Sequence, residues 1–408
     1  MRTALLHALQ DQRERVIDLQ RGLTAIPALG PENGGDGELR KMRYIEAQLA
    51  RVGVTDLERI DAPDERVPEG IRPNLVARVP GRSPRTLWIL GHVDVVPPGD
   101  LALWTSDPWT LAVDGDTLVG RGVEDNQQAL VSGLLLAETL VASGATPELT
   151  LGLLCMADEE TGNRYGLEYV LRVRPDLFRP DDLILVPDFG SADGAMLEVA
   201  EKAVLWLKIS TTGTQCHGST PHKGVNAMVA GAELTLRLLD LHKEFPAENP
   251  LFDPPASTFT PTRRDANVPN VNTVPGSDVF YMDCRILPQY APDDVLAAAR
   301  RLAREVEERR GVRVTVEAQH LLPTAPPTPA DSEVVVRLID AVRAVYGIEA
   351  RPTGIGGSTV ACLLRQRGLP AAVWCRVLSN CHEPNEKSRI SNAIGDAQVF
   401  AHLLYPHE

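Results

Sequence analysis

The spacing of apolar and polar residues changes along this chain, and the change predicts two structural units. Short apolar runs at 86–91, 149–157 and 183–187 alternate with a helical pattern at 126–143. Buried strands that alternate with helices are typical of an α/β sheet whose strands run mostly parallel. The first half of the chain therefore predicts a mixed, mostly parallel sheet flanked by helices.

From about residue 201 the pattern is different. Residues 202–213 alternate between apolar and polar side chains, which predicts a long strand with one buried face. The elements expected after it are a helix at about 223–243, a Pro-rich loop at 252–269, strands at 271–276 and 278–287, a helix at about 291–310 and a strand at 312–318. This order, β-α-β-β-α-β, is that of a ferredoxin-like α+β fold.

A Pro-rich linker at 323–332 returns the chain to the first pattern, with a helix and then an apolar strand at 369–377. We therefore expect a larger domain built from residues 1–200 and 320–408, with a smaller domain, 201–319, inserted into it. A length of 408 residues agrees with two domains rather than one.

Composition excludes several classes of partner. The net charge of −14 argues against nucleic acid or an anionic membrane as the main partner. No apolar run approaches the roughly 18 residues that a membrane span needs, and charges within residues 1–23 predict an amphipathic helix rather than a signal peptide. The six cysteines include no CxxC pair, as expected of reduced thiols. We expect a soluble, cytoplasmic protein.

Acidic and histidine residues follow the predicted strands of the larger domain. The side chains in question are His92, Asp125, the run Asp158-Glu159-Glu160, Asp188 and His382. Asp125 opens the helix at 126–143, and the others come directly after a strand or after a strand and a short loop. Because ligands bind at the carboxyl ends of strands in open α/β sheets, we expect His92, Asp125, Glu160, Asp188 and His382 to form one metal site.

The ligand set suits two divalent ions. Histidine and carboxylate together favour zinc, manganese or cobalt over calcium or magnesium. Asp125 could bridge the two ions, His92 and Asp188 would complete one, and Glu160 and His382 the other. Three carboxylates and a bridging hydroxide would then balance the four positive charges, and two such ions can activate water and polarise a carbonyl.

Two neighbouring acids have expected roles besides metal binding. Asp94 is two residues beyond His92 and fits an acceptor that fixes the imidazole tautomer. Glu159 is next to a ligand but is not needed as one, so it is the natural general base. Each group alone also has an ordinary explanation: a core histidine, a solvated acidic turn, or an N-cap for Asp125. These explanations do not account for the gathering of all five ligands at one sheet edge.

The motifs resemble those of the metallopeptidases of clan MH, which include glutamate carboxypeptidase, acetylornithine deacetylase and succinyl-diaminopimelate desuccinylase. The matching segments are GHVDVVPPGD, WTSDPW, DGDTLVGRGVEDN, MADEETG and CHEPNE, and the likeness runs from about residue 70 to the end. The resemblance implies a zinc-peptidase-like catalytic domain with an inserted lid that forms a homodimer. It also implies the ligand pairs given above, Glu159 as base and a cis peptide bond after Asp125.

In the inserted domain, QCHGSTPHKGVNA resembles the family's segment that carries a histidine into the partner subunit's active site, which implies that His217 stabilises the oxyanion there. The resemblance further implies that Asn272 and Arg285 contact the substrate carboxylate and that Gly357 lines the substrate pocket. From the residues alone, His217 could be a loop histidine, Arg285 a member of a sheet-face ion pair, and GIGGS a phosphate-binding loop.

Three segments depart from the commonest family pattern: VEDNQQA, GGSTVAC and VPDFGS. None removes a ligand, but together they preclude copying the specificity of one relative. We expect a di-metal hydrolase that cleaves the amide bond of an N-acyl amino acid or a short peptide bearing a free carboxylate. A non-catalytic peptide- or metal-binding protein on the same scaffold and a two-metal aminopeptidase are the alternatives.

Overall fold

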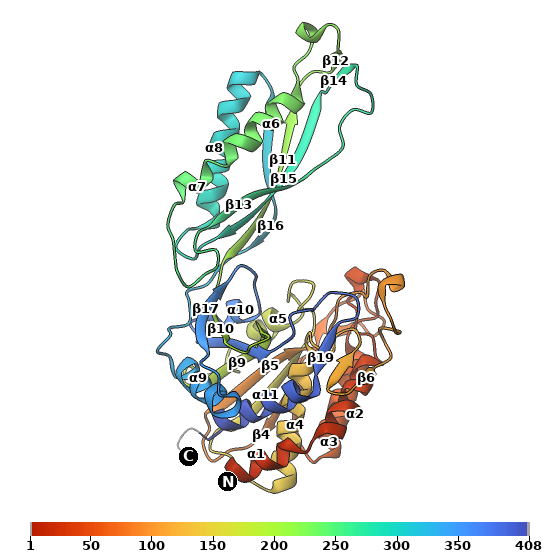
Figure 1. Cartoon of the computed structure of the whole chain (residues 1–408), viewed down its shortest axis with the longest axis vertical. Helices are drawn as coiled ribbons and strands as arrows, with labels where there is room; N and C mark the ends of the chain where they lie inside the picture. Colours follow the sequence, from red (N-terminus) through yellow and green to blue (C-terminus); the bar gives the residue numbers. More distant parts are fainter. Residues whose placement is uncertain (1, 406–408) are drawn as a thin grey trace. The chain divides into compact units, whose positions relative to one another are not determined.

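The computed structural model describes residues 2–405 and divides the chain into two compact units (Figure 1). The larger unit contains residues 1–199, 328–352 and 359–408, and the smaller unit contains 200–327 and 353–358. None of the helices within residues 2–405 is long and apolar enough to cross a membrane.

An eight-stranded sheet forms the centre of the larger unit, and β10 and β17 at its edge lead into the smaller one. In spatial order its strands are β1 (Asp56–Arg59), β4 (Leu75–Val79), β8 (Thr150–Met156), β5 (Thr86–His92), β9 (Leu183–Ser191), β18 (Ala371–Arg376), β10 (Met196–Glu201) and β17 (Arg351–Ile355). The neighbours β8, β5, β9 and β18 run parallel, whereas β1, β4 and β10 pair antiparallel. The mixed, mostly parallel sheet predicted from the sequence is confirmed at its centre.

Helices lie on both faces of this sheet. They are α1 (Arg2–Gln10), α2 (Arg13–Thr24), α3 (Leu39–Arg51), α4 (Gln127–Ser143), α5 (Leu167–Val173), α9 (Glu333–Tyr346), α10 (Ala361–Arg365) and α11 (Ile390–Leu403). Apolar residues of α5 and α10 pack on one face of the central strands. On the other face, α4 crosses the sheet beside α11 (Figure 1). The amphipathic N-terminus forms two helices, α1 and α2, where one was predicted.

Short elements complete the larger unit. Three strands form a small sheet, β6 (Ala112–Asp114), β7 (Thr117–Val119) and β19 (Lys387–Arg389), and two form a ribbon, β2 (Ala62–Pro63) and β3 (Ile71–Arg72). Single 3₁₀ turns lie at Pro31–Asn33 and Leu101–Leu103. The pairing of β19 with β7 matters for function because it ties the C-terminal segment, which carries His382, to the loop before α4.

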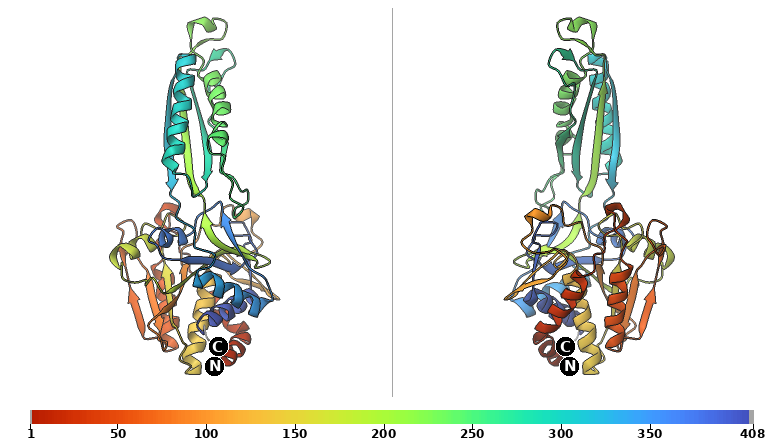
Figure 2. Two further views of the ribbon diagram at one scale, coloured as in Figure 1. Left: turned by 90° about the vertical axis from the view of Figure 1, so that its left-hand side faces the viewer. Right: turned by 90° about the vertical axis from the view of Figure 1, so that its right-hand side faces the viewer.

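The smaller unit contains an antiparallel sheet of four strands with helices packed on one face (Figure 2). Its strands, in spatial order, are β13 (Thr258–Arg264), β15 (Ser277–Ile286), β11 (Ala203–Thr212) and β16 (Arg313–Leu322). The helices are α6 (Ala227–Leu238), α7 (Leu241–Glu244) and α8 (Pro292–Arg310), with a 3₁₀ turn at Pro221–Lys223. The strands β12 (Cys216–His217) and β14 (Thr273–Val274) pair separately. The helices and main-sheet strands follow the predicted order β-α-β-β-α-β, but β13 takes the place that the prediction gave to residues 271–276.

The prediction of a Pro-rich loop at 252–269 is wrong for Thr258–Arg264, which form β13. β13 is an edge strand, and Pro261 is tolerated there because the register shifts between Pro261 and Arg263. The predicted strand at 271–276 is extended only at Thr273–Val274 and lies outside the main sheet. The helix predicted at 223–243 begins later, at Ala227, because the Asn226 side chain caps it by accepting from the Val229 N–H.

A large-to-small pairing holds the centre of the larger sheet together. Trp88 on β5 lies opposite Gly152 on β8, and a Cβ atom at Gly152 would meet the Trp88 ring at 2.5 Å. The indole N–H donates to the buried Asp182 carboxylate at 2.9 Å, so the ring cannot turn away without losing that hydrogen bond.

Gly152→Ala should therefore lower the free energy of unfolding by about 1–3 kcal/mol, as expected when a packed core is overfilled. Urea denaturation of the full chain measures this change. The double variant Gly152→Ala/Trp88→Leu should lose less than the sum of the two single losses, because the smaller side chain makes room for the methyl group. Strict additivity would contradict the proposed packing.

Candidate metal centre

Four adjacent parallel strands bring the candidate ligands to one edge of the large sheet. His92 is the last residue of β5, Asp188 lies near the end of β9, and Glu160 follows the end of β8. His382 comes after β18, in a turn where its own φ is +64°. Asp125 lies two residues before α4, next to a cis peptide bond with Asn126. The structure thus brings together the five residues that the sequence suggested as ligands.

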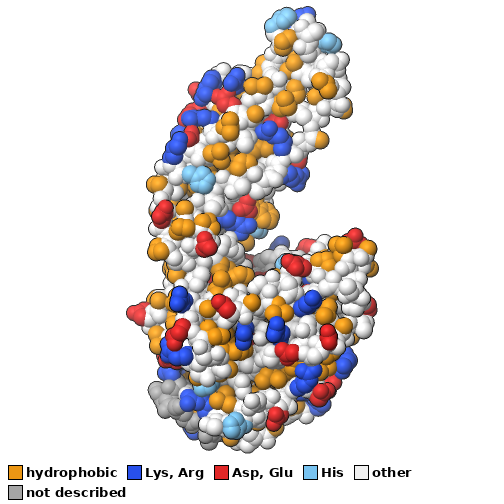
Figure 3. Space-filling view, in the orientation of Figure 1, with side chains coloured by type: hydrophobic (Ala, Val, Ile, Leu, Met, Phe, Trp, Pro, Cys, Tyr) orange, Lys and Arg blue, Asp and Glu red, His pale blue; other side chains and the backbone are white. Residues whose placement is uncertain are grey.

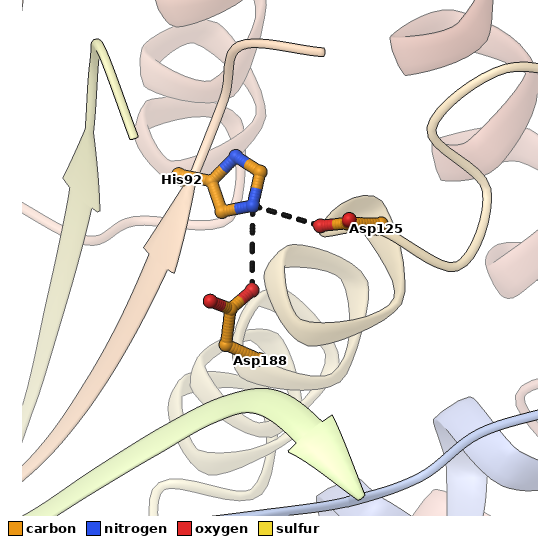
Figure 4. A group of neighbouring side chains, drawn as sticks. All are labelled: His92, Asp125 and Asp188. Carbon is orange, nitrogen blue, oxygen red and sulfur yellow. Dashed lines mark hydrogen bonds and ion pairs between the residues drawn. The ribbon is translucent and has the colours of Figure 1, made fainter. Parts of the chain in front are cut away.

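These side chains form two groups that share Asp125. His92, Asp125 and Asp188 each offer a ligand atom within 4.8 Å of the others, and so do Asp125, Glu160 and His382. In the first group, His92 Nε2 lies 2.9 Å from Asp125 Oδ1 and 3.3 Å from Asp188 Oδ1 (Figure 4). In the second, His382 Nε2 lies 3.1 Å from Asp125 Oδ2 and 3.2 Å from Glu160 Oε1. The Asp125 carboxylate therefore presents one oxygen to each group.

The protonation of these groups reflects a concentration of negative charge. Burial lowers the pKa of His92, but its hydrogen bonds with Asp125 and Asp188 outweigh burial and raise the pKa well above its ordinary value. Hydrogen bonds with Asp125 and Glu160 likewise raise the pKa of His382 to about 10. Burial raises the pKa of Asp125, yet the hydrogen bonds from both histidines bring it well below the usual range. In the metal-free protein, protons on the two imidazoles thus supply positive charge between the carboxylates.

Asp94 has a wider role than the sequence suggested. Its backbone carbonyl accepts from His92 Nδ1 at 3.0 Å, and its carboxylate lies 3.4 Å from the same nitrogen. The two carboxylate oxygens also accept from the backbone N–H groups of Glu159, at 3.1 Å, and Glu160, at 3.0 Å. Asp94 therefore turns Nε2 of His92 toward the ligand group and fixes the segment that carries the candidate base and a ligand.

The segment around Glu159 is held from a second side. Asp158 has a left-handed φ of +63°, and its carboxylate accepts from Tyr165 N at 2.9 Å and from the buried Arg72 at 3.3 Å. Burial raises the pKa of Glu159 well above its ordinary value, and the nearby Asp188 carboxylate adds to the effect. A carboxylate in these surroundings holds a proton more tightly than one in water, which suits a group that must take a proton from water and keep it until it is passed on.

Three further residues position the ligands, and the sequence analysis did not single them out. The Asn126 amide donates to Asp188 Oδ1 at 2.8 Å, and its oxygen accepts from the His92 N–H at 3.2 Å. The buried Glu386 carboxylate accepts from Asp125 N at 3.0 Å. Glu124 accepts from Asn380 N at 3.0 Å, close to His382. The sequence could have indicated these residues only through their position, since each lies one to four residues from a proposed ligand.

Comparison with known proteins identifies the family. The sequence pattern of peptidase family M20/M25/M40 matches residues 88–405. The chain belongs to this family. It is 37% identical to a protein named uncharacterized metallohydrolase MMP1398 from Methanococcus maripaludis, over 96% of this chain and 99% of that one. It is also 27% identical to a succinyl-diaminopimelate desuccinylase of Gluconacetobacter diazotrophicus, over 97% and 98% of the two chains.

Solved structures of two dipeptidases share the fold. The Saccharomyces cerevisiae dipeptidase Dug1p matches with a TM-score of 0.75 and 17% identity, over 99% of this chain and 98% of that one. Human carnosine dipeptidase 1 matches with a TM-score of 0.74 and 16% identity, also over 99% of this chain and 98% of that one. These structures show the fold alone. The family match and the sequence relatives establish the protein as an M20-type metallohydrolase, and the predicted family and enzyme class are confirmed.

The residues present fit the divalent metal ions of a metallohydrolase. Each group combines one imidazole nitrogen with carboxylate oxygens, a donor set that suits zinc and similar transition metals. The hydrogen bond at His92 Nδ1 leaves Nε2 to act as the ligand atom.

The remaining predicted site residues belong to the smaller unit. His217 is exposed on β12, and its Nδ1 accepts from Ser219 N at 3.1 Å, which leaves Nε2 as the ring nitrogen that can donate. Asn272 is also exposed, and its backbone carbonyl accepts from Gly218 N at 2.7 Å. Arg285 on β15 forms an ion pair with Asp283 and also donates to the carbonyl of Gly356, next to Gly357.

Metal binding by the metal-free protein should release protons at pH 7. The pKa of His382 is about 10 and that of His92 is also raised, so both rings are protonated at pH 7 and must lose a proton to become ligands. Burial also raises the pKa of the proposed ligand Glu160 to about 7, so this carboxyl group holds part of a further proton at pH 7. We expect release of about two to three protons for full loading with Zn²⁺, and an apparent affinity that rises with pH. The dependence of the calorimetric binding enthalpy on the buffer's ionisation enthalpy measures the number.

His382→Ala should reduce the number of protons released, whereas His7→Gln, a change at an exposed histidine on α1, should leave it unchanged. Zn²⁺ binding with no proton release at pH 7 would contradict the protonation states described for these two imidazoles.

Proposed function

We propose that the protein uses two divalent metal ions, zinc by preference and manganese or cobalt otherwise, to hydrolyse an amide bond. The substrate is an N-acyl amino acid or a short peptide with a free carboxylate. The observation that carries this proposal is the Asp125 carboxylate, with one oxygen 2.9 Å from His92 and the other 3.1 Å from His382. A shared carboxylate of this kind is suited to holding two ions close together.

The chemistry that two such ions supply when bound is acidification of a water molecule and polarisation of the substrate carbonyl. Glu159 then takes a proton from the attacking water and delivers it to the leaving amine. Its raised pKa supports this role, because it must hold the proton between the two steps. Asp94 fixes the position of Glu159 through the backbone N–H of that residue.

Recognition of the substrate carboxylate falls to the smaller unit in this proposal. Arg285, with Asn272, contacts the carboxylate, and the backbone at Gly357 lines the pocket. His217 stabilises the developing oxyanion from the partner subunit of a homodimer. The contact of Nδ1 with Ser219 N supports this role, because it leaves Nε2 to serve as the hydrogen-bond donor that an oxyanion needs.

The proposed dimer uses the smaller unit, as the family resemblance implies. An exposed row of apolar side chains supports this surface: Met228, Ala232 and Leu236 on α6, and Leu239 at its C-cap. Their spacing of three or four residues places them on one face of the helix. Leu236 is 70% exposed, and hydrophobic side chains reach the surface in this region of the smaller unit (Figure 3). A second copy of the chain would cover the row.

We further propose that the protein works in the cytoplasm. All six cysteines are free thiols, which supports a reducing compartment.

Glu159→Ala should lower kcat by roughly 10²–10⁴-fold, the range for loss of a general acid–base group, and leave Zn²⁺ content unchanged. The neighbouring change Glu160→Gln should lower both metal content and activity, because Glu160 is a proposed ligand. Steady-state kinetics on N-acyl amino acids and dipeptides, with metal analysis of each variant, test this pair.

Most of the activity surviving in Glu159→Ala would contradict the mechanism. Metal binding without hydrolysis of any compound would favour a non-catalytic binding protein. Substrates with blocked amino or blocked carboxyl ends separate the proposal from an aminopeptidase, which needs the free amine instead of the free carboxylate.

Leu236→Glu should convert the dimer to a monomer in sedimentation velocity and lower activity by about tenfold or more, because a charge in the apolar row opposes its burial. Val336→Glu, at a 46% exposed valine on α9 of the larger unit, is the matched control and should remain dimeric. A wild-type monomer with full activity would exclude the action of His217 across subunits.

A further inference from the structure

The four-stranded sheet of the smaller unit has one face that no helix of this unit covers (Figure 2). Alternate residues of β11 and β15, such as Leu205, Leu207 and Cys284, enter the core beneath α6 and α8. Trp206, Asp283 and Arg285 occupy the intervening positions and so lie together on the other face. Trp206 is 45% exposed, although it is a large aromatic residue in a central strand.

Asp283 links the other two side chains. Its Oδ2 accepts from the Trp206 indole N–H at 2.8 Å and from Arg285 Nη2 at 3.0 Å, while Oδ1 accepts from Arg285 Nε at 2.7 Å. Trp206 and Asp283 are directly opposite in the β11–β15 register, and Trp206 is a diagonal neighbour of Arg285. The Trp206 indole ring and the Arg285 guanidinium are therefore held in fixed orientations on one sheet face.

The guanidinium of Arg285 keeps part of its donor capacity. Nε and Nη2 donate to Asp283, and Nη1 donates to the Gly356 carbonyl at 2.8 Å. Because each terminal nitrogen carries two N–H groups, one N–H on Nη1 and one on Nη2 donate to no acceptor among residues 2–405. A carboxylate can accept both in the bidentate geometry that arginine favours.

The Trp206 ring is fixed on its other side as well. His320 on β16 is opposite Trp206 in register, and the two ring centroids are 4.7 Å apart. With the indole N–H bound to Asp283 and His320 against the ring, Trp206 forms a rigid and partly exposed aromatic surface. Such a surface loses little conformational entropy when an apolar group packs on it.

We propose that Trp206 determines specificity, by giving the enzyme a preference for substrates whose carboxyl-terminal residue has an aromatic or large apolar side chain. This inference rests on the proposed function, in which Arg285 binds the substrate carboxylate. The side chain of an α-amino acid begins at the atom next to its carboxylate. A carboxylate held at Arg285 therefore brings that side chain within reach of Trp206, because diagonal neighbours on a sheet face are about 7–8 Å apart.

Asp283 is a positioning residue in this arrangement, because it orients both the guanidinium and the indole ring without needing to contact the substrate. The proposal thus assigns the two parts of a C-terminal residue to two side chains. Arg285 receives the carboxylate, and Trp206 receives the side chain.

The test compares N-acyl-L-phenylalanine with N-acylglycine, both carrying the acyl group that the wild-type enzyme hydrolyses fastest. We expect the wild type to prefer phenylalanine in kcat/KM. Trp206→Ala should reduce this preference by about tenfold, mainly through KM, as loss of an aromatic contact predicts. Trp206→Phe should keep most of it, because it preserves an apolar ring.

Tyr281→Ala is the matched control. Tyr281 is opposite Lys208 in register, and this pair is the next one on the same sheet face after Trp206 and Asp283. The Tyr281 ring contacts Arg263 rather than Arg285. Its removal should leave the preference unchanged. Calorimetric binding of N-acyl-L-phenylalanine to the inactive Glu159→Ala protein gives a second measure, and adding Trp206→Ala should weaken that binding by a similar factor.

Asp283→Ala tests the positioning role. It should reduce both the preference for phenylalanine over glycine and the preference for the free acid over N-acyl-L-phenylalaninamide, whereas Trp206→Ala should reduce the first alone. Circular dichroism and the dimer content of each variant show whether a loss comes from misfolding.

An unchanged preference in Trp206→Ala, with wild-type turnover intact, would overturn the inference and leave the proposed function standing. Absence of hydrolysis of every acyl amino acid and dipeptide by the metal-loaded wild type would overturn both.

Discussion

Asp125 has to present one carboxylate oxygen to each of two ligand groups, and the surrounding structure serves this requirement. The groups bring together the carboxylates of Asp125, Glu160 and Asp188, with Glu159 close by. Such a collection of negative charge at a partly buried site is unfavourable unless cations or donors offset it. In the metal-free protein the protonated imidazoles of His92 and His382 provide that offset.

A further set of residues holds the backbone on which these ligands lie. Glu386 is 1% exposed and accepts from the N–H groups of Glu124 and Asp125, while Arg121 donates to it at 2.7 Å. The Asp94 carboxylate likewise accepts from the backbone N–H groups of Glu159 and Glu160. Breaking such buried pairs is costly, because the remaining charge stays buried without a partner. Buried carboxylates thus fix the main chain, and the main chain fixes the ligands.

The sequence was informative where position along a strand determines position in space. His92 and Asp188 could be assigned because parallel strands end at one edge of the sheet, so residues far apart in sequence become neighbours. The same reasoning could not find the double role of Asp94, since its bonds to Glu159 and Glu160 depend on how a loop folds back. It also missed β13, because prolines tolerated in an edge strand look like loop signals in the sequence.

Metal chemistry and the proposed recognition of the substrate rely on separately packed cores. Strands of the larger unit that end at the ligands pack against α5 and α10. Strands that carry Trp206, Asp283 and Arg285 pack against α6 and α8 in the smaller unit. A substitution on the open sheet face of the smaller unit can therefore alter which carboxylate is bound without disturbing the packing that holds Asp125. On these proposals the candidate metal ligands and Glu159 depend on one core, whereas the contact of Trp206 with the substrate depends on the other.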